Sequence, residues 1–300
     1  MAQLCLARGF TLSFESPKST SLSLFKHGEL AYDHVMLLPP KSKGLGPNLA
    51  PNVLVDYVNK DGNILLVLSA DQPTPSAISS LLLELDIALP PERNALVVDH
   101  LNYDVKSAAE KHDVLLLPAP KSLKPGVKDY FSVGGILAVP RAVGQVLGNA
   151  SPLLAPILKA PSTAYSYNPK DDAETMEDPF AVGEQLSLVT AFQARNSARF
   201  TVLGSAEMLE DKWFDATVQK PDGSESATAN KKFAEKLSAW TFKELGVVKV
   251  GHLQHYLNED LGTGRNLTLP DFTQTYDGLY RIKNKVVRLA HPFATPPSPC

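Results

Sequence analysis

Short apolar runs alternate with amphipathic helical patterns over residues 25–139, and this alternation constrains the fold more than any other feature. The clearest unit is residues 48–69. Leu49, Leu54 and Val58 recur there at helical spacing, Gly62 is placed to end the helix in a left-handed conformation, and residues 63–69 form a continuous apolar run. Apolar runs without polar alternation are typical of strands buried on both faces of a parallel sheet. The pattern predicts an α/β fold with a doubly wound, mostly parallel sheet.

The same reasoning predicts the other elements. Residues 75–85 are expected to be helical, and an amphipathic helix is expected around Phe233, Leu237 and Trp240, with Gly246 as its stop. Strands are predicted at residues 34–39, 95–98, 114–118, 135–139, 186–192, 198–203 and 247–250.

Changes in composition suggest the domain boundaries. Residues 1–250 form the predicted α/β domain, with a surface excursion near 147–184 where Pro, Ser and acidic residues lack a regular period. Residues 251–285 are expected to begin a β-rich domain that this chain does not complete, opening with a strand at 278–283. Residues 286–300 are expected to be an irregular tail, since the last ten residues contain four prolines.

Charge and cysteine content exclude several classes of protein. The 300 residues have a net charge of -3 and no block of Lys or Arg, so nucleic acid is not an expected partner. Cys5 and Cys300 lie at opposite ends, which leaves no disulfide framework. No apolar run approaches the roughly 20 residues of a membrane-spanning helix, and no secretory signal is visible. Taken alone, the residues predict a soluble intracellular protein.

The sequence contains no recognisable catalytic centre. It has no Gly-x-Ser-x-Gly nucleophile elbow, no third glycine beside its Gly-x-Gly pairs, and no cysteine at a strand-to-helix turn. His252 and His255 are three residues apart after a predicted strand, where this spacing does not bring two side chains together on one metal. We therefore predict no catalytic residue, no cofactor and no metal site.

Two pairs of polar residues are candidates for ligand binding. Asp33 and His34 lie at the start of the first clear strand, and Asp99 and His100 follow another. Ligands of α/β sheets commonly bind at strand ends. Capping and turn formation explain the same residues equally simply, so both interpretations remain open.

Two Asn-x-Ser/Thr sequons are candidates for N-glycosylation, at Asn149 and Asn266. Pro152 directly follows the first sequon and disfavours it. Asn266 lies in a polar stretch and is the better candidate.

Several long strings extend the interpretation beyond physical patterns. They are SLSLFKHGELAYDHVMLLP at 21–39, VDYVNKDGNI at 55–64, PSTAYSYNP at 161–169, AFQARNSAR at 191–199 and LYRIK at 279–283. In this order they closely resemble the family of the 48 kDa subunit of the eukaryotic oligosaccharyltransferase, over roughly residues 9 to 285.

The resemblance implies a domain similar to class I glutamine amidotransferases and to a domain of intraflagellar transport proteins. It also implies a non-catalytic luminal subunit in the endoplasmic reticulum membrane, belonging to a single-pass protein. The complex of this family transfers a preassembled oligosaccharide from dolichyl diphosphate to Asn in Asn-x-Ser/Thr. The implied partners are the other subunits, including the catalytic polytopic one, and the lipid-linked oligosaccharide donor.

The sequence departs from the family at both ends. The family has a signal peptide followed by a first strand, a complete second β-rich domain and a C-terminal membrane span, whereas the resemblance here begins near Arg8 and fades after Lys285. We therefore expect a fragment or a faulty gene model. Without a neighbouring first strand, residues 11–14 and 34–38 would have unpaired backbone groups, and the chain alone would be poorly soluble.

Two other function classes fit the residues. One is a soluble amidotransferase-like enzyme, which the parallel-sheet pattern allows. The other is a soluble glycan-binding module that uses the strand ends near Asp33 and Asp99.

Overall fold

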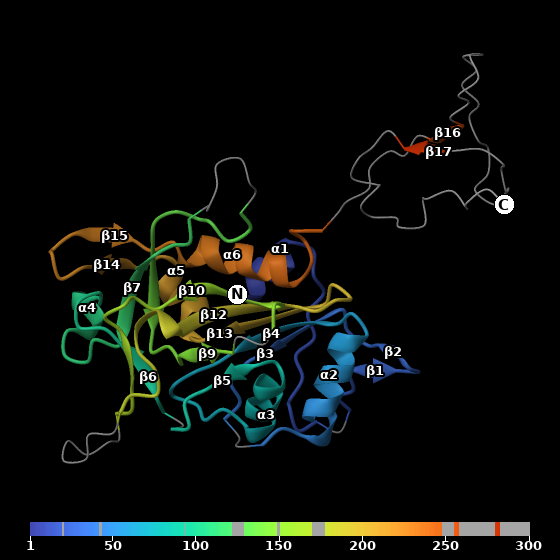
Figure 1. Ribbon diagram of the computed structural model, residues 1–300, viewed down its shortest axis with the longest axis horizontal. Helices are drawn as coiled ribbons and strands as arrows, with labels where there is room; N and C mark the ends of the chain where they lie inside the picture. The colour runs from blue at the N-terminus through green and yellow to red at the C-terminus, as the bar shows by residue number, and fades with distance from the viewer. Residues whose placement is uncertain are drawn as a thin grey trace. The chain divides into compact units, whose positions relative to one another are not determined.

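The structure is a computed structural model that describes residues 1–19, 21–41, 44–92, 94–121, 129–148, 151–169, 178–247, 255–257 and 280–282. The chain divides into two units, Met1–Leu245 and Gly246–Cys300. Figure 1 shows the ribbon with its helices and strands labelled.

A seven-stranded sheet forms the centre of the first unit. Its strand order is β3-β4-β13-β12-β9-β5, and β10 pairs with β12 beside this path. The strands are β3 (His34–Leu37), β4 (Asn63–Val67), β5 (Ile87–Ala88), β9 (Gln145–Leu147), β10 (Leu154–Lys159), β12 (Leu186–Gln193) and β13 (Arg199–Leu203).

The prediction of a mostly parallel sheet is wrong. Among the described strand ladders, only β3–β4 and β4–β13 are parallel, whereas β12 is antiparallel to β13, β9 and β10. The reason lies in the connections. Strands β12 and β13 are joined by residues 194–198, and so short a connection permits only an antiparallel pair, because a parallel crossover needs a dozen or more residues.

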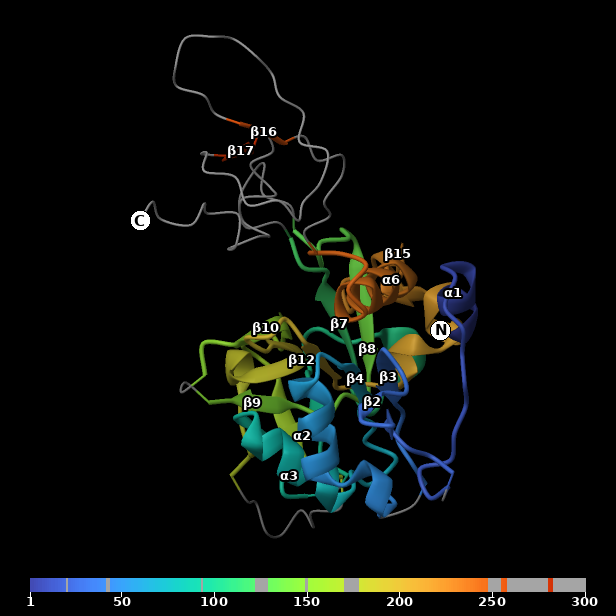
Figure 2. The same cartoon turned by 90° about the vertical axis from the view of Figure 1, so that its right-hand side faces the viewer.

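Helices cover both faces of the sheet, which confirms the α/β class (Figures 1 and 2). Ile64 and Leu66 of β4 pack in one apolar cluster with residues of α2 and α3, whereas Leu65 and Val67 pack in the other with residues of α6 and with Cys5 of α1. These helices are α1 (Ala2–Ala7), α2 (Pro51–Asn59), α3 (Ser76–Glu84) and α6 (Asn230–Thr241). Strand β4 is thus buried on both faces, as its continuous apolar run predicts.

Smaller two-stranded sheets surround this core. The antiparallel pairs are β1 (Phe25–Lys26) with β2 (Glu29–Leu30), β6 (Leu96–Val98) with β11 (Tyr165–Tyr167), β7 (Val114–Pro118) with β8 (Ile136–Pro140), and β14 (Thr217–Gln219) with β15 (Glu225–Ala227). The short helices are α4 (Val105–Ala108), α5 (Asp211–Phe214), and the 3-10 turns Pro47–Leu49, Gly183–Gln185 and Glu207–Leu209.

Two predicted helix ends differ from the structure. The left-handed residue after α2 is Asp61, with φ 73°, and Gly62 is needed for a different reason: a Cβ there would lie 2.3 Å from the ring of Tyr57. Helix α6 ends at Thr241, before the predicted stop at Gly246, and Lys243 already has a φ of 59°.

The predicted surface excursion at residues 147–184 is wrong for part of its length. Residues 154–159 form β10, which pairs with β12 inside the main sheet, and residues 165–167 form β11. Pro156 and the register shifts on either side of Leu158 interrupt the regular alternation that would have identified β10 from sequence.

In the second unit the structure describes an antiparallel pair, β16 (His255–Leu257) with β17 (Tyr280–Ile282). Strand β17 falls within the predicted strand at 278–283. Residues 248–250 of the predicted strand at 247–250, most of the β-rich segment at 251–285 and the tail at 286–300 lie outside the described residues.

Candidate functional site

A large opening in the first unit lies along β3, the strand at one edge of the main sheet. We call it the edge groove. Its volume is about 1230 Å³. One wall is the irregular segment of residues 9–18 and the other is residues 31–41, which include β3. The groove extends past the ends of β3 and β4 to residues 72–75 and to Glu210, at the carboxyl ends of parallel strands where α/β folds commonly bind ligands.

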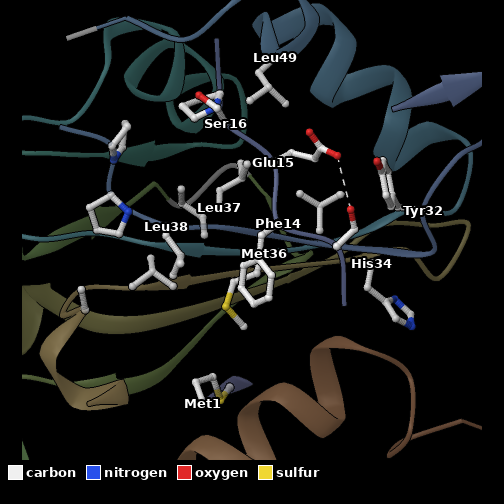
Figure 3. A pocket seen from close by; sticks show the side chains of 18 of the residues that line it. Met1, Phe14, Glu15, Ser16, Tyr32, His34, Met36, Leu37, Leu38 and Leu49 are labelled. Carbon is white, nitrogen blue, oxygen red and sulfur yellow. Dashed lines mark hydrogen bonds between the residues drawn. The ribbon is translucent and has the colours of Figure 1, made fainter. Parts of the chain in front are cut away.

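Apolar side chains dominate the lining of the edge groove. Leu49, Leu66 and Ile78 contribute buried surface, whereas Phe14 is 79% exposed and Leu38 is 56% exposed. Figure 3 shows Phe14, Met36 and Leu38 around the opening, together with the polar side chains of Glu15 and Tyr32. Large apolar side chains exposed side by side are typical of a surface that binds another molecule.

Polar side chains also line the edge groove, among them Glu15, Asp33 and Glu210, and two hydrogen bonds lie at its wall. The Ser13 hydroxyl donates to the Glu15 carboxylate at 3.5 Å, the dashed line of Figure 3. The Tyr57 hydroxyl donates to the carbonyl oxygen of Tyr32 at 2.7 Å, and burial raises the pKa of Tyr57. The exposed apolar side chains therefore suit the groove to binding an apolar group.

Asp33 and His34, predicted from sequence as binding residues, both line the edge groove. The His34 ring stacks on Phe242, with centroids 5.0 Å apart, and its Nδ1 lies 3.2 Å from the side-chain nitrogen of Asn63. Burial lowers the pKa of His34, and the nearby Asp33 carboxylate partly opposes this effect. The backbone carbonyl of Asp33 accepts a hydrogen bond from Asn63 N at 3.3 Å. His34 is thus a packed ring at the groove wall.

Asp99 and His100 lie elsewhere, after β6, and do not line the edge groove. Asp99 is fully buried, and its carboxylate accepts hydrogen bonds from Leu101 N, Asn102 N, Asn102 Nδ2 and Thr163 Oγ1 at 2.7–3.2 Å. Asp99 thus stabilises the turn that follows β6. His100 is exposed at the tip of that turn and contacts His112, a residue that the sequence reasoning did not single out.

The remaining candidates are buried or lie outside the described residues. Cys5 is 3% exposed and packs in the core. Ser205, which follows β13 in a Gly-Ser turn without a second glycine, has its hydroxyl buried against the carbonyl oxygen of Pro140. Asn149 and Asn266 lie outside the described residues, as does Cys300. Within the described part of the chain, no group of three or more His, Cys, Asp or Glu converges on a metal position, and no helix has the length and apolar character needed to cross a bilayer.

Sequence reasoning missed the outer wall of the groove, residues 9–18. These residues belong to no described helix or strand. Residues 10–15 nevertheless alternate apolar and polar side chains, with Phe10, Leu12 and Phe14 as the apolar ones. This alternation is the period of a strand, and it does not indicate that the segment forms the wall of a groove.

Comparisons with known proteins agree with the resemblance. The family model described as OST48, N-terminal domain, matches residues 3–244. The "Dolichyl-diphosphooligosaccharide--protein glycosyltransferase 48 kDa subunit" of Danio rerio is 36% identical over 255 residues, covering 83% of this chain and 56% of that protein. The same subunit of Drosophila melanogaster is 32% identical, with 85% of this chain and 56% of the relative covered.

A third relative comes from Schizosaccharomyces pombe, the "Dolichyl-diphosphooligosaccharide--protein glycosyltransferase subunit wbp1", at 32% identity over 93% of this chain and 59% of the relative. The chain thus spans a little over half the length of these curated relatives. Among solved structures, the mmIFT52 N-terminal domain is similar at 14% identity and a TM-score of 0.46, over 72% of this chain and 78% of that one. The match over residues 3–244 and these relatives show that the chain belongs to the OST48 family, through its N-terminal domain.

Proposed function

We propose that this chain is part of a non-catalytic subunit of the oligosaccharyltransferase complex, which transfers a preassembled oligosaccharide from dolichyl diphosphate to Asn residues of nascent proteins. The observation that carries the proposal is the family match over residues 3–244, supported by relatives that carry the name of this glycosyltransferase subunit. On this proposal the chain holds the complex together and leaves the transfer reaction to another subunit.

The state of Cys5 supports a non-catalytic role. An amidotransferase-like enzyme needs an accessible thiolate at a strand-to-helix turn. Cys5 instead lies within α1, is 3% exposed and has its sulfur 3.7 Å from the Arg8 guanidinium. Glutamine hydrolysis that survives replacement of both Cys5 and Cys300 by Ala would revive the amidotransferase-like alternative.

The edge groove supports contact with the other subunits of the complex. Phe14 and Leu38 expose large apolar surfaces on either side of an opening that continues into the apolar core. Burial of such surface at about 25 cal/mol per Å² is the main driving force in most protein–protein association. We propose that the groove is covered by another subunit when the complex assembles.

Co-purification tests both parts of the proposal. The full-length gene product, tagged in its native cell, is expected to bring down the other oligosaccharyltransferase subunits. The double variant F14S/L38S is expected to recover several-fold less of them. The matched control is Leu83→Ser, which changes a leucine that is 64% exposed on α3 and does not line the groove.

The possible results separate the two parts. Failure of the unmodified protein to bring down the other subunits would remove the assignment to the complex. Equal recovery by F14S/L38S and L83S would remove the role of the groove and leave the assignment in place.

We also propose that residues 3–244 face the lumen of the endoplasmic reticulum. Protease treatment of sealed microsomes is the test. The domain is expected to resist digestion until detergent opens the membrane, and digestion in sealed microsomes would contradict a luminal location.

A further inference from the structure

His100 and His112 are brought together by the backbone between β6 and β7. The amide of Asp99 donates to the carbonyl oxygen of His112 at 3.2 Å, and the amide of Asp104 donates to that of Val114 at 3.0 Å. The four hydrogen bonds to the buried Asp99 carboxylate fix the turn that carries His100. Hydrogen bonds therefore fix the backbone that carries both imidazoles.

Contacts on two sides hold the His112 ring. Its backbone has a φ of 50°, the left-handed region in which His, Asn and Asp are the most frequent residues after Gly. The Tyr103 ring packs against its imidazole, with centroids 3.9 Å apart. Its Nε2 lies 3.1 Å from the carbonyl oxygen of Ala109. Because a carbonyl oxygen only accepts, Nε2 carries the proton, and Nδ1 of the neutral ring has a free lone pair.

That lone pair faces the other histidine. The two Nδ1 atoms are 2.5 Å apart, and the rings are nearly perpendicular, at 79°. On the opposite side of its ring, Nε2 of His100 lies 2.9 Å from the Tyr165 hydroxyl. Each ring thus has an oxygen partner at Nε2 and directs Nδ1 toward the other. In histidines that bind metals, the nitrogen that is not a ligand almost always donates to an oxygen, and an oxygen lies within reach of Nε2 in both rings.

We propose that His100 and His112 form a two-histidine site for a divalent transition-metal ion of the Zn²⁺ or Cu²⁺ class, bound through both Nδ1 atoms. Tetrahedral Zn²⁺ at about 2.0–2.1 Å from each nitrogen would place the nitrogens roughly 3.3 Å apart. The rings therefore need to separate by less than about 1 Å and to turn, so that both Nδ1 lone pairs point at the metal rather than at each other. His100 is exposed and can make this adjustment. Water completes the coordination, since no third His, Cys, Asp or Glu joins the pair within the described residues.

The proton balance of the site is simple. In the metal-free pair, His100 donates its Nδ1 proton to His112 and accepts at Nε2 from Tyr165. On metal binding this proton moves to Nε2, and the Tyr165 oxygen becomes its acceptor. No net proton is released from the neutral pair.

Titration of the 300-residue chain with Zn²⁺ tests the proposal, followed by calorimetry and by long-range ¹H–¹⁵N spectra of the histidine side chains. The Nδ1 resonances of His100 and His112 are expected to shift together. The variants H100N and H112N are each expected to bind Zn²⁺ at least tenfold more weakly. Asn tolerates the left-handed backbone of position 112, so this variant removes the imidazole without adding strain.

His27 provides a matched control. It is also exposed, and its φ of 54° is close to that of His112, so H27N repeats the change on the same kind of backbone away from the site. The variant Y165F provides a second test, because it removes only the oxygen partner of His100 Nε2. It is expected to weaken Zn²⁺ binding several-fold. Absent or unequal shifts of the two Nδ1 resonances at millimolar Zn²⁺, or equal binding by H112N and H27N, would overturn the proposal. Because the probe is the metal alone, neither result bears on the proposed function.

Discussion

Arg8 and Glu244 form an ion pair that joins α1 to the residues just after α6, with Nη1 and a carboxylate oxygen 2.9 Å apart. The same guanidinium donates to the carbonyl oxygen of Glu235 at 3.1 Å and to the Ser238 hydroxyl at 3.0 Å. The Arg8 side chain thus links α1 to α6 and to the residues that follow α6.

Replacing Arg8 with Met is expected to lower the free energy of unfolding by about 1–3 kcal/mol, since hydrogen bonds to charged groups contribute about this much. Urea denaturation followed by far-UV circular dichroism measures the change. Arg195→Met, in the exposed turn between β12 and β13, serves as the control and is expected to change stability by less than about 0.5 kcal/mol. Equal effects of the two variants would contradict the role of Arg8.

Gly62→Ala is expected to destabilise the protein by about 1–3 kcal/mol, the usual cost of overpacking. The new Cβ would lie 2.3 Å from Cε1 of Tyr57, whose ring is fully buried between α2 and the sheet. Thermal melts compare it with Gly44→Ala, where the Cβ meets nothing within 4 Å. A melting temperature of G62A equal to that of G44A would show that the Tyr57 ring can move aside.

Asn230 is expected to be among the least replaceable polar residues of the core. Its side-chain oxygen accepts from Ala138 N at 3.0 Å and its nitrogen donates to Ala138 O at 2.7 Å, so it joins the start of α6 to β8. Asn230→Ala leaves two backbone groups without these partners, at a cost of about 2–4 kcal/mol. Asn52→Ala, at an exposed position of α2, is the control for the same denaturation experiment. A small effect of N230A would mean that water replaces the amide.

His34 is expected to make stability fall in acid. Burial lowers its pKa below the ordinary value of 6.5, so the unfolded chain binds this proton more readily than the folded one. The part of the unfolding free energy that depends on neutral His34 is therefore fully present above pH 6.5, and it is lost as the pH falls below that value. In His34→Phe the ring still stacks on Phe242 but does not titrate, so the loss of stability between about pH 7.5 and 5 becomes smaller. Unchanged pH dependence in H34F would contradict this assignment, and H27N controls for loss of an exposed histidine.

The sequence predicted most of the individual elements, because local patterns determine them. Residues 63–67 are apolar at every position but Asn63, and residues 51–59 repeat at helical spacing, so β4 and α2 could be identified. Strand direction was not identified, although the short connection between β12 and β13 contained that information.

Tertiary contacts account for what the sequence could not predict. Asp99 and His100 were chosen for their position after a strand, but nothing local to them indicates that His112 returns to the same turn. The edge groove depends on residues 9–18 lying opposite β3, and the alternating apolar side chains at positions 10, 12 and 14 do not indicate where in the fold this segment lies.

Strand β4 acquires its second neighbour only after residues 199–203 have been synthesised as β13. A ribosome that adds about 5–20 residues per second takes roughly ten seconds to synthesise the chain between β4 and the end of β13. During this time the apolar residues 64–67 have β3 on one side and no permanent partner on the other. Contacts so distant in sequence also slow folding once the chain is complete. The yield of folded protein in a cell is therefore expected to depend on the pace of translation and the supply of chaperones as well as on final stability.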